Sequence, residues 1–274
     1  MSEENKDKLL PSATVLLLRD GAEGLEVFMV VRHHKIDSFS GALVFPGGKC
    51  DPGDGDPALR NFCPRAGEMS DEMLSFHVAA VREAFEECGV LLARERGTMK
   101  LIDAARLADL SARYRQALVD NETDMLTLCR EENLDLAVNQ MVHFAHWITP
   151  VVVPKRFDTH FFLAAAPADH LAAHDGMEST DSVWIRPQDA MADADAERRT
   201  VVFPTRMNLV KLARAGTVAE ALEQAKADPI VTVLPTVEPD ASKETRVMNI
   251  PAAAGYGASR IRVNTAGAQP QFLD

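Results

Sequence analysis

Apolar positions along the chain alternate between short runs, typical of buried strands, and longer helical patterns. Residues 13–19 and 25–32 are apolar runs joined by a Gly-containing loop, which predicts a β-hairpin. Further strands are expected at 42–45, 142–148, 159–165 and 183–185, and helices at about 70–93, 103–119, 123–132, 205–215 and 217–227. Residues 49–69 are expected to form a loop, because they contain three prolines and several glycines.

The order of these elements indicates one mixed α/β domain that extends to about residue 228. From residue 229 the composition changes. Prolines interrupt the chain at positions 229, 235, 239 and 251, and glycines follow at 255, 257 and 267. We therefore expect residues 229–274 to form an extended C-terminal arm with at most short strands, and not a second domain.

Three glutamates share one face of the helix expected at 70–93. At about 100° per residue, Glu83, Glu86 and Glu87 fall within about 100° of one another. The apolar positions of the same helix lie on the opposite face: Val78, Val81, Phe85, Cys88 and Leu92. The helix is therefore expected to turn one side to a core and to carry a carboxylate cluster on the other.

The carboxylate cluster has two interpretations. It is either a solvated acidic face or a site for a cation that offsets the repulsion between like charges one turn apart. Oxygen-only donors suit Mg²⁺ or Mn²⁺ better than Zn²⁺. Before the helix, Gly47 and Gly48 follow an expected strand, where they let a backbone approach a ligand closely, although Pro46-Gly47-Gly48 is also an ordinary turn. The two features in this order favour the cation site.

The composition and net charge of the chain exclude several classes of binding partner. The 274 residues carry a formal charge of −12, which argues against a non-specific coat on DNA or RNA and against adhesion to an anionic membrane. No apolar run reaches the ~18 residues of a membrane span, and the N-terminus lacks the apolar region of a signal peptide. The four cysteines form no CxxC pair and have no zinc-type spacing with histidine, so we expect reduced thiols and a cytoplasmic protein.

Residues 82–90 resemble the second half of the signature of the Nudix hydrolases. That signature is a Gly, five residues, a Glu, seven residues and then Arg-Glu-U-x-Glu-Glu-x-Gly-U, where U is a bulky aliphatic residue. The sequence Arg82-Glu83-Ala84-Phe85-Glu86-Glu87-Cys88-Gly89-Val90 matches this half, and Gly48 corresponds to the leading Gly. Two features depart from the pattern: Asp54 stands where the family has Glu, and 28 positions separate Asp54 from Arg82 where the pattern gives 8.

The enlarged loop resembles one subgroup of the family. An insertion at about 55–75, a helical insertion at about 100–138 and the segments 147–150 and 156–159 are similar to the coenzyme A diphosphatase-like subgroup, which includes peroxisomal enzymes and bacterial relatives. The resemblance implies that residues 1–228 form a Nudix α/β/α sandwich with a mixed sheet, an inserted helical segment and the extended C-terminal arm.

The resemblance also implies roles for individual residues. The implied ligands of Mg²⁺ or Mn²⁺ are Glu83, Glu86, Glu87 and the Gly47 carbonyl. The implied substrate-binding residues are Arg32, Gly48, Lys49 and Arg156. Arg82 is expected to orient a carboxylate. The family commonly adds a glutamate from a later loop, for which Glu178 is the candidate, and the general base is expected to be Glu83 or Glu178.

A Nudix hydrolase of this subgroup would be Mg²⁺-dependent and would cleave a diphosphate linkage, with coenzyme A or an acyl-coenzyme A as the first expectation. One alternative substrate class is ADP-ribose, NADH or a similar nucleoside diphosphate. A second alternative is a catalytically silent Nudix-fold module that binds a nucleotide, although such modules tend to lose the glutamates that are present here. We expect a small-molecule partner, no nucleic-acid polymer, no membrane, and a homodimer in which the arm crosses to the partner.

Overall fold

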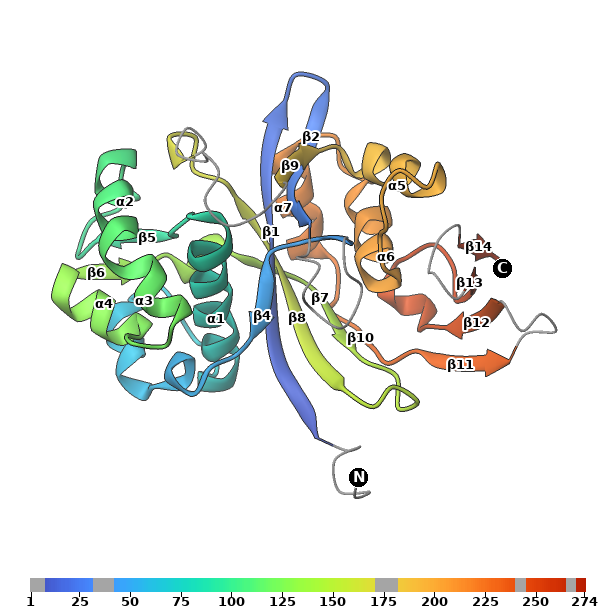
Figure 1. Cartoon of the computed structure of the whole chain (residues 1–274), viewed down its shortest axis with the longest axis horizontal. Coiled ribbons are helices and arrows are strands. Elements are labelled where there is room, and N and C mark those ends of the chain that lie inside the picture. The colour runs from blue at the N-terminus through green and yellow to red at the C-terminus, as the bar shows by residue number, and fades with distance from the viewer. Residues whose placement is uncertain (1–7, 32–41, 171–181, 240–244, 265–269) are drawn as a thin grey trace.

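The computed structural model describes residues 8–31, 42–170, 182–239, 245–264 and 270–274. A mixed sheet runs through its centre in the order β10-β7-β8-β1-β2-β3 (Figure 1). The two longest strands, β1 (Leu9–Gly21) and β8 (Arg156–Ala165), are parallel neighbours. The other strands on this path are β2 (Gly24–Val31), β3 (Leu43–Val44), β7 (Val142–Ile148) and β10 (Thr232–Val233).

The predicted hairpin is present as β1 and β2, but β1 is longer than its apolar run. Its second half pairs antiparallel with β2, from Leu18↔Val27 to Gly21↔Gly24. Its first half pairs antiparallel with β4 (Gly47–Lys49), a segment whose sequence was interpreted either as an ordinary turn or as a glycine pair close to a ligand. A further strand, β9 (Ser182–Ile185), pairs antiparallel with β2. The sheet is therefore split along one edge of β1, with β4 at one end and β2 at the other.

Helices cover the two faces of the sheet in separate groups (Figure 1). On one face lie α1 (Asp71–Cys88), α2 (Ala104–Leu110), α3 (Gln116–Val119) and α4 (Met125–Glu132). On the other lie α5 (Pro187–Asp195), α6 (Phe203–Leu212) and α7 (Val218–Ala227). The expected α/β/α sandwich is confirmed. None of the described helices is both long enough and apolar enough to cross a membrane.

The central strand β1 is buried on both faces at residues 15–18, which explains the uninterrupted apolar sequence there. Val15 and Leu17 contribute to the core cluster on the α1 side of the sheet. Leu16 and Leu18 contribute to the cluster on the side of α6 and α7. This division follows from the period of two along a strand.

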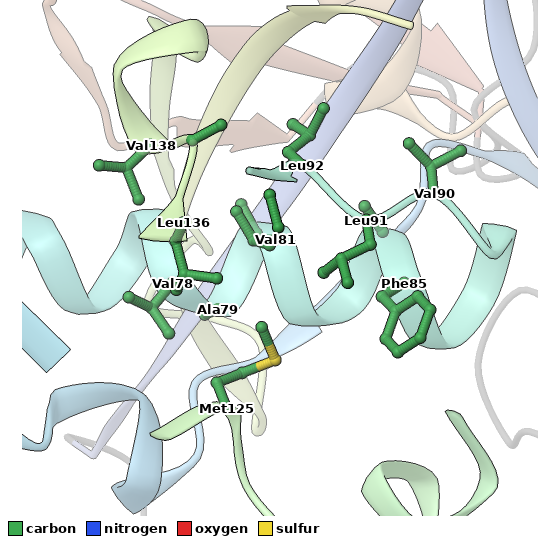
Figure 2. Close-up of a cluster of buried hydrophobic side chains, with 14 of the residues drawn as sticks. Val78, Ala79, Val81, Phe85, Val90, Leu91, Leu92, Met125, Leu136 and Val138 are labelled. Atoms are coloured by element: carbon green, nitrogen blue, oxygen red, sulfur yellow. The ribbon is translucent and has the colours of Figure 1, made fainter. Parts of the chain in front are cut away.

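The helix α1 is shorter at its C-terminus than the expected 70–93. It begins as predicted, because the Ser70 side chain accepts a hydrogen bond from the Met73 amide. It ends at Cys88, because Gly89 adopts a left-handed conformation with φ 67° that terminates the helix. Figure 2 shows the apolar face of α1, where Val81 and Phe85 lie among buried side chains that follow the helix and others from the insertion.

The insertion contains more regular structure than its composition suggested. Residues 49–69, expected to be a loop, include two 3₁₀-helices, Pro52–Gly55 and Pro57–Phe62. A π-helical segment, Ser111–Arg115, joins α2 to α3. The short strands β5 (Ala93–Glu95) and β6 (Leu134–Leu136) pair antiparallel and close the helical insertion. These strands and α5 were missed, because they are too short to show a period.

The C-terminal segment contains short strands that form a sheet of their own. Its order is β11 (Thr236–Pro239), β12 (Thr245–Asn249), β13 (Arg260–Asn264) and β14 (Gln271–Phe272), all antiparallel. The loop between β12 and β13 packs on the α/β core, where the buried Tyr256 hydroxyl accepts from Trp147 Nε1 at 2.8 Å and donates to Asn208 Oδ1 at 3.0 Å. The described part of this segment is therefore anchored to its own chain.

Candidate active site

The site begins where β4 lies between β1 and α1. Both glycines of β4 are required by close contacts. A β-carbon on Gly47 would lie 2.5 Å from the Ala13 carbonyl oxygen. A β-carbon on Gly48 would lie 2.5 Å from Glu83 Oε1. Real β-carbons do not approach so closely, so the Gly-Gly pair lets a helix carboxylate rest directly against a strand.

Arg82 organises the carboxylates around it. Its Nε and Nη2 donate to the two oxygens of Asp54, each at 3.0 Å. Its Nη1 donates to Glu83 Oε1 at 3.0 Å and to Glu86 Oε2 at 3.1 Å. Its Nη2 also donates to the Lys49 carbonyl at 2.8 Å. One planar guanidinium thereby ties α1 to β4 and to the 3₁₀-helix that follows it.

Burial and charge raise the pKa of the carboxyl groups in this network. Burial raises the pKa of Glu83 to about 8, and the neighbouring Glu87 and Glu86 add to the rise against the opposing effect of Arg82. Burial is also the main cause of the raised pKa values of Asp54 and Glu86, again opposed by Arg82. These carboxyl groups are therefore harder to ionise than exposed ones, and Arg82 offsets part of that cost.

Glu87 is the most exposed of the three glutamates and has a separate contact. Its Oε2 accepts a hydrogen bond from the Gly47 amide at 3.0 Å. Glu83, Glu86 and Glu87 thus meet β4 and Arg82 on one side of α1, as the helical spacing predicted.

The remaining predicted residues are spread more widely. The Lys49 side chain is exposed next to the glycines. Arg156 is buried at the start of β8, where its Nε donates to the Thr149 carbonyl at 3.0 Å. It pairs with Leu9, four positions along β1 from the residue beside Gly48. Arg32 and Glu178 lie outside the described residues.

Asp51 and Asp54 are the acidic residues whose part in the site the sequence did not establish. Asp54 is buried with 3% of its surface exposed, and it also accepts from the Asp51 amide at 2.8 Å. Asp51 Oδ2 lies 3.7 Å from Arg82 Nη1. The signal for Asp54 was its position six residues after Gly48, but the insertion before Arg82 obscured the pairing. The 3₁₀-helix Pro52–Gly55, capped by Asp51, turns Asp54 back toward α1.

The donor set of this site fits a hard divalent cation. Arg82 faces four carboxylates, those of Asp51, Asp54, Glu83 and Glu86, so negative charge exceeds positive charge locally. All side-chain donors are carboxylate oxygens, which are the ligands preferred by Mg²⁺ and Mn²⁺. In the described part of the chain, three side-chain ligand atoms lie within 4.8 Å of one another only in a different cluster, so the glutamates here do not form a closed cage.

Comparisons with known proteins agree with the fold. A family model described as the NUDT19 Nudix domain matches residues 58–212. The chain is 22% identical over 233 residues to the acyl-coenzyme A diphosphatase NUDT19 of Xenopus laevis, covering 71% of this chain and 61% of that protein. It is 26% identical over 211 residues to the acyl-coenzyme A diphosphatase NUDT19 of Homo sapiens, covering 62% and 55%. The alignments thus span less than two thirds of the length of these relatives.

A solved structure supports the same assignment of the fold. The crystal structure of a NUDIX hydrolase from Alicyclobacillus acidocaldarius superposes with a TM-score of 0.60 and 25% sequence identity. The match covers 81% of this chain and 97% of that one. The match therefore extends well beyond the length of the carboxylate helix.

Proposed function

The chain belongs to the NUDT19 Nudix domain family, and from this premise we propose that it hydrolyses a diphosphate linkage in a nucleoside diphosphate derivative with the help of Mg²⁺ or Mn²⁺. The observation that carries the proposal is the Arg82 network. It holds Glu83 and Glu86 beside the Gly47-Gly48 strand and pairs Arg82 with Asp54. A module that had lost catalysis would have no evident need for this buried and electrostatically costly arrangement.

We propose Glu83, Glu86 and Glu87 as the cation ligands, with the Gly47 carbonyl as a further one. The bound ion would neutralise phosphate charge and lower the pKa of a water molecule. Arg82 would orient Glu83 and Glu86, because it donates to both from a position fixed by Asp54 and the Lys49 carbonyl. The glycine backbone of β4 would leave room for a phosphate next to these carboxylates.

The general base is proposed to be Glu83 or Glu178. A Glu→Gln change at the residue that accepts the proton removes a step of the reaction and leaves ground-state contacts to the substrate in place. Because Glu83 is also a proposed cation ligand, both variants are compared at saturating Mg²⁺, where a larger fall in kcat at little changed KM would identify the base. Arg32, Gly48, Lys49 and Arg156 are proposed to contact the substrate, and Lys49 is adjacent to the two glycines.

The proposed substrate is coenzyme A or an acyl-coenzyme A. The names of the Xenopus and human relatives, both acyl-coenzyme A diphosphatases, support this class. ADP-ribose and NADH are the competing substrates. A mass-spectrometric panel in Mg²⁺ with coenzyme A, acetyl-coenzyme A, ADP-ribose, NADH and a dinucleoside polyphosphate separates them.

The products formed in that panel distinguish the proposed substrate from its alternatives. Release of 3′,5′-ADP with the phosphopantetheine product from the coenzyme A compounds alone supports the proposed specificity. Turnover of ADP-ribose or NADH instead keeps the hydrolase and replaces the substrate. Binding without turnover of any compound would support the silent nucleotide-binding module.

Two further proposals concern the state of the protein. We propose that it works in the cytoplasm, since all four cysteines are free thiols and three of them are buried. We also propose that it forms a homodimer. A mass in solution that equals one chain at all concentrations would contradict the dimer.

A further inference from the structure

Three side chains on the central sheet converge outside the glutamate site. His146 comes from β7, and Asp158 and His160 come from β8. One ligand atom from each lies within 4.8 Å of the others, and among the described residues no other group of three His, Cys, Asp or Glu side chains meets this distance. We call these three residues the His/Asp cluster. His146 Nε2 lies 2.5 Å from Asp158 Oδ1, and the rings of His146 and His160 stack with centroids 4.1 Å apart.

A β-bulge creates the histidine face on which the cluster lies. Residues 143 and 146 would face opposite sides of a regular strand, because side chains alternate. The pairing of β7 with β8 shifts between His143↔Phe162 and Ala145↔Phe161, so one extra residue is accommodated on β7. His143 and His146 therefore reach the same face as His160. The bulge is stabilised by α6, where the buried Lys211 Nζ donates a hydrogen bond to the Phe144 carbonyl at 3.1 Å.

Each histidine of the cluster has its second ring nitrogen engaged. His146 Nδ1 is 2.8 Å from Thr232 Oγ1 on β10, which leaves Nε2 directed at Asp158. His160 Nδ1 is 3.0 Å from His143 Nε2. The Nε2 atom of His160 is therefore its nitrogen for binding a metal. Partners of this kind on the outer nitrogen orient metal-binding histidines and set their tautomer. A core histidine held only by packing requires no such pair of supports.

The surroundings of the His/Asp cluster differ from one residue to the next. His160 is buried against Phe76 of α1, with ring centroids 4.1 Å apart, whereas His146 and Asp158 are partly exposed. The cluster is therefore packed against α1 at His160 and partly exposed to solvent at His146 and Asp158.

We propose that His146 Nε2, Asp158 and His160 Nε2 form a second metal site, specific for a borderline transition-metal ion of the Zn²⁺ type. Two imidazoles and one carboxylate are a donor set for Zn²⁺ and similar ions and are unsuited to Mg²⁺. Three protein ligands with one open side leave a coordination position for water. The ion would take the place of the hydrogen bond between His146 and Asp158 and would join β7 to β8.

The cluster is separate from the glutamate site, although both lie on the same face of the sheet. Gly48 pairs with Ala13, Ala13 pairs with His160, and His160 pairs with His146. At about 4.8 Å per strand, roughly 10 Å of sheet separate Gly48 from His160. The two sites draw on different elements and different donor chemistry, so they can be loaded independently. The second site does not depend on the proposed hydrolase activity.

Metal content in the full-length protein tests the site. The chain is stripped with a chelator, saturated with Mg²⁺ to occupy the carboxylates, and titrated with Zn²⁺, with bound zinc measured by mass spectrometry of the metal. We expect about one tightly bound equivalent, lost in His146→Asn, Asp158→Asn and His160→Gln. His143→Gln is expected to weaken binding about 10- to 100-fold, since it removes only the support of His160. Glu87→Gln and the neighbouring His77→Gln are the controls and are expected to keep the zinc.

Co²⁺ substitution provides a second measurement on unmodified protein. Binding to two imidazoles and a carboxylate with an open position is expected to give visible absorption bands of a four- or five-coordinate ion, which Zn²⁺ then displaces. Zinc binding that survives all three ligand changes, or wild-type protein that neither binds Zn²⁺ nor shows the Co²⁺ spectrum, overturns the proposal. Because the Co²⁺ measurement uses the wild-type protein, it tests the site even if a variant fails to fold.

Discussion

Arg82 donates to both carboxylate oxygens of Asp54, although 28 positions separate the two residues in the chain. Both side chains are buried, with 5% and 3% of their surface exposed. The pair therefore joins the beginning of the inserted loop to the carboxylate helix. The two residues are in contact despite the long insertion between them. This contact fixes the orientation from which Arg82 donates to Glu83 and Glu86.

Removing the charge of Asp54 is expected to destabilise the protein and impair turnover. Asp54→Asn leaves the buried guanidinium without its main partner, and breaking a buried ion pair costs about 3–5 kcal/mol. Chemical denaturation measures the loss, and Glu68→Gln on the exposed part of the same loop is the matched control. Asp54→Glu, which keeps the charge, is expected to recover part of the stability. Equal stability of wild type and Asp54→Asn would contradict the structural role.

Adding a single methyl group at Gly48 is expected to lower activity more than stability. The new β-carbon would lie 2.5 Å from Glu83 Oε1, so the carboxylate must move. Displacing a catalytic group by about 1 Å can cost roughly 100-fold in rate. Steady-state kinetics of Gly48→Ala measures the effect. Gly55→Ala is the control, because its β-carbon would meet only an ordinary 3.8 Å contact with Ser75. A Gly48→Ala enzyme with unchanged kcat would show that Glu83 need not stay in place.

Metal dependence is expected to be lost with the charge of Glu87. Glu87→Gln keeps the size of the side chain but removes a proposed ligand, so saturating Mg²⁺ should no longer support full turnover. Activity is measured against Mg²⁺ concentration for both proteins. Full Mg²⁺-dependent turnover in Glu87→Gln would refute the ligand assignment. Chelation of the wild type is also expected to weaken substrate binding, because carboxylates would then face phosphates directly.

Acid is expected to destabilise the fold through His77. This residue is buried under the sheet, its Nδ1 lies 2.8 Å from the Met73 carbonyl, and burial lowers its pKa from 6.5 to about 4. Between these two values the unfolded chain binds more protons than the folded one, so the free energy of unfolding falls as the pH falls. From pH 7 to pH 5, this shift corresponds to about 2 kcal/mol.

The comparison with His77→Phe isolates this contribution from other titrating groups. Wild type and variant are unfolded by urea at several pH values. The difference between their free energies of unfolding is expected to shrink or reverse toward pH 5, because only the wild type has a histidine here that the unfolded chain protonates and the folded chain keeps neutral. Burial of His143 acts in the same direction, whereas the raised pKa of Glu86 acts in the opposite one. A difference that does not vary with pH would show that His77 does not titrate as its burial requires.

The C-terminal sheet is expected to depend on Tyr256 for its attachment. Tyr256→Phe removes the acceptor of Trp147 Nε1 and the donor to Asn208 Oδ1, both in a buried environment. Leaving such groups unsatisfied costs about 1–3 kcal/mol. Thermal unfolding measures the loss, and Phe272→Tyr on the exposed β14 is the control. Unchanged stability, with proteolysis of the C-terminal segment no faster than in wild type, would argue against this anchor.

Local patterns in the sequence were sufficient for much of this protein. The hairpin of β1 and β2, the strand β7 and the face shared by Glu83, Glu86 and Glu87 each follow from spacing within one element. Such spacing depends only on the geometry of a strand or a helix turn, so it can be recognised in the sequence alone. The resemblance to the Nudix hydrolases came from residues 82–90, and the family model that matches the chain agrees with it.

Features that need two distant segments required the folded chain. The Gly47-Gly48 pair looked like a turn until β1 provided a strand for it to join. Asp54 met Arg82 only because a capped 3₁₀-helix folds the insertion back on α1. His143 and His146 share a face with His160 because a bulge in β7 shifts its register by one residue. Register, bulges and loop closure arise from packing between elements, and no periodicity within a single segment encodes them.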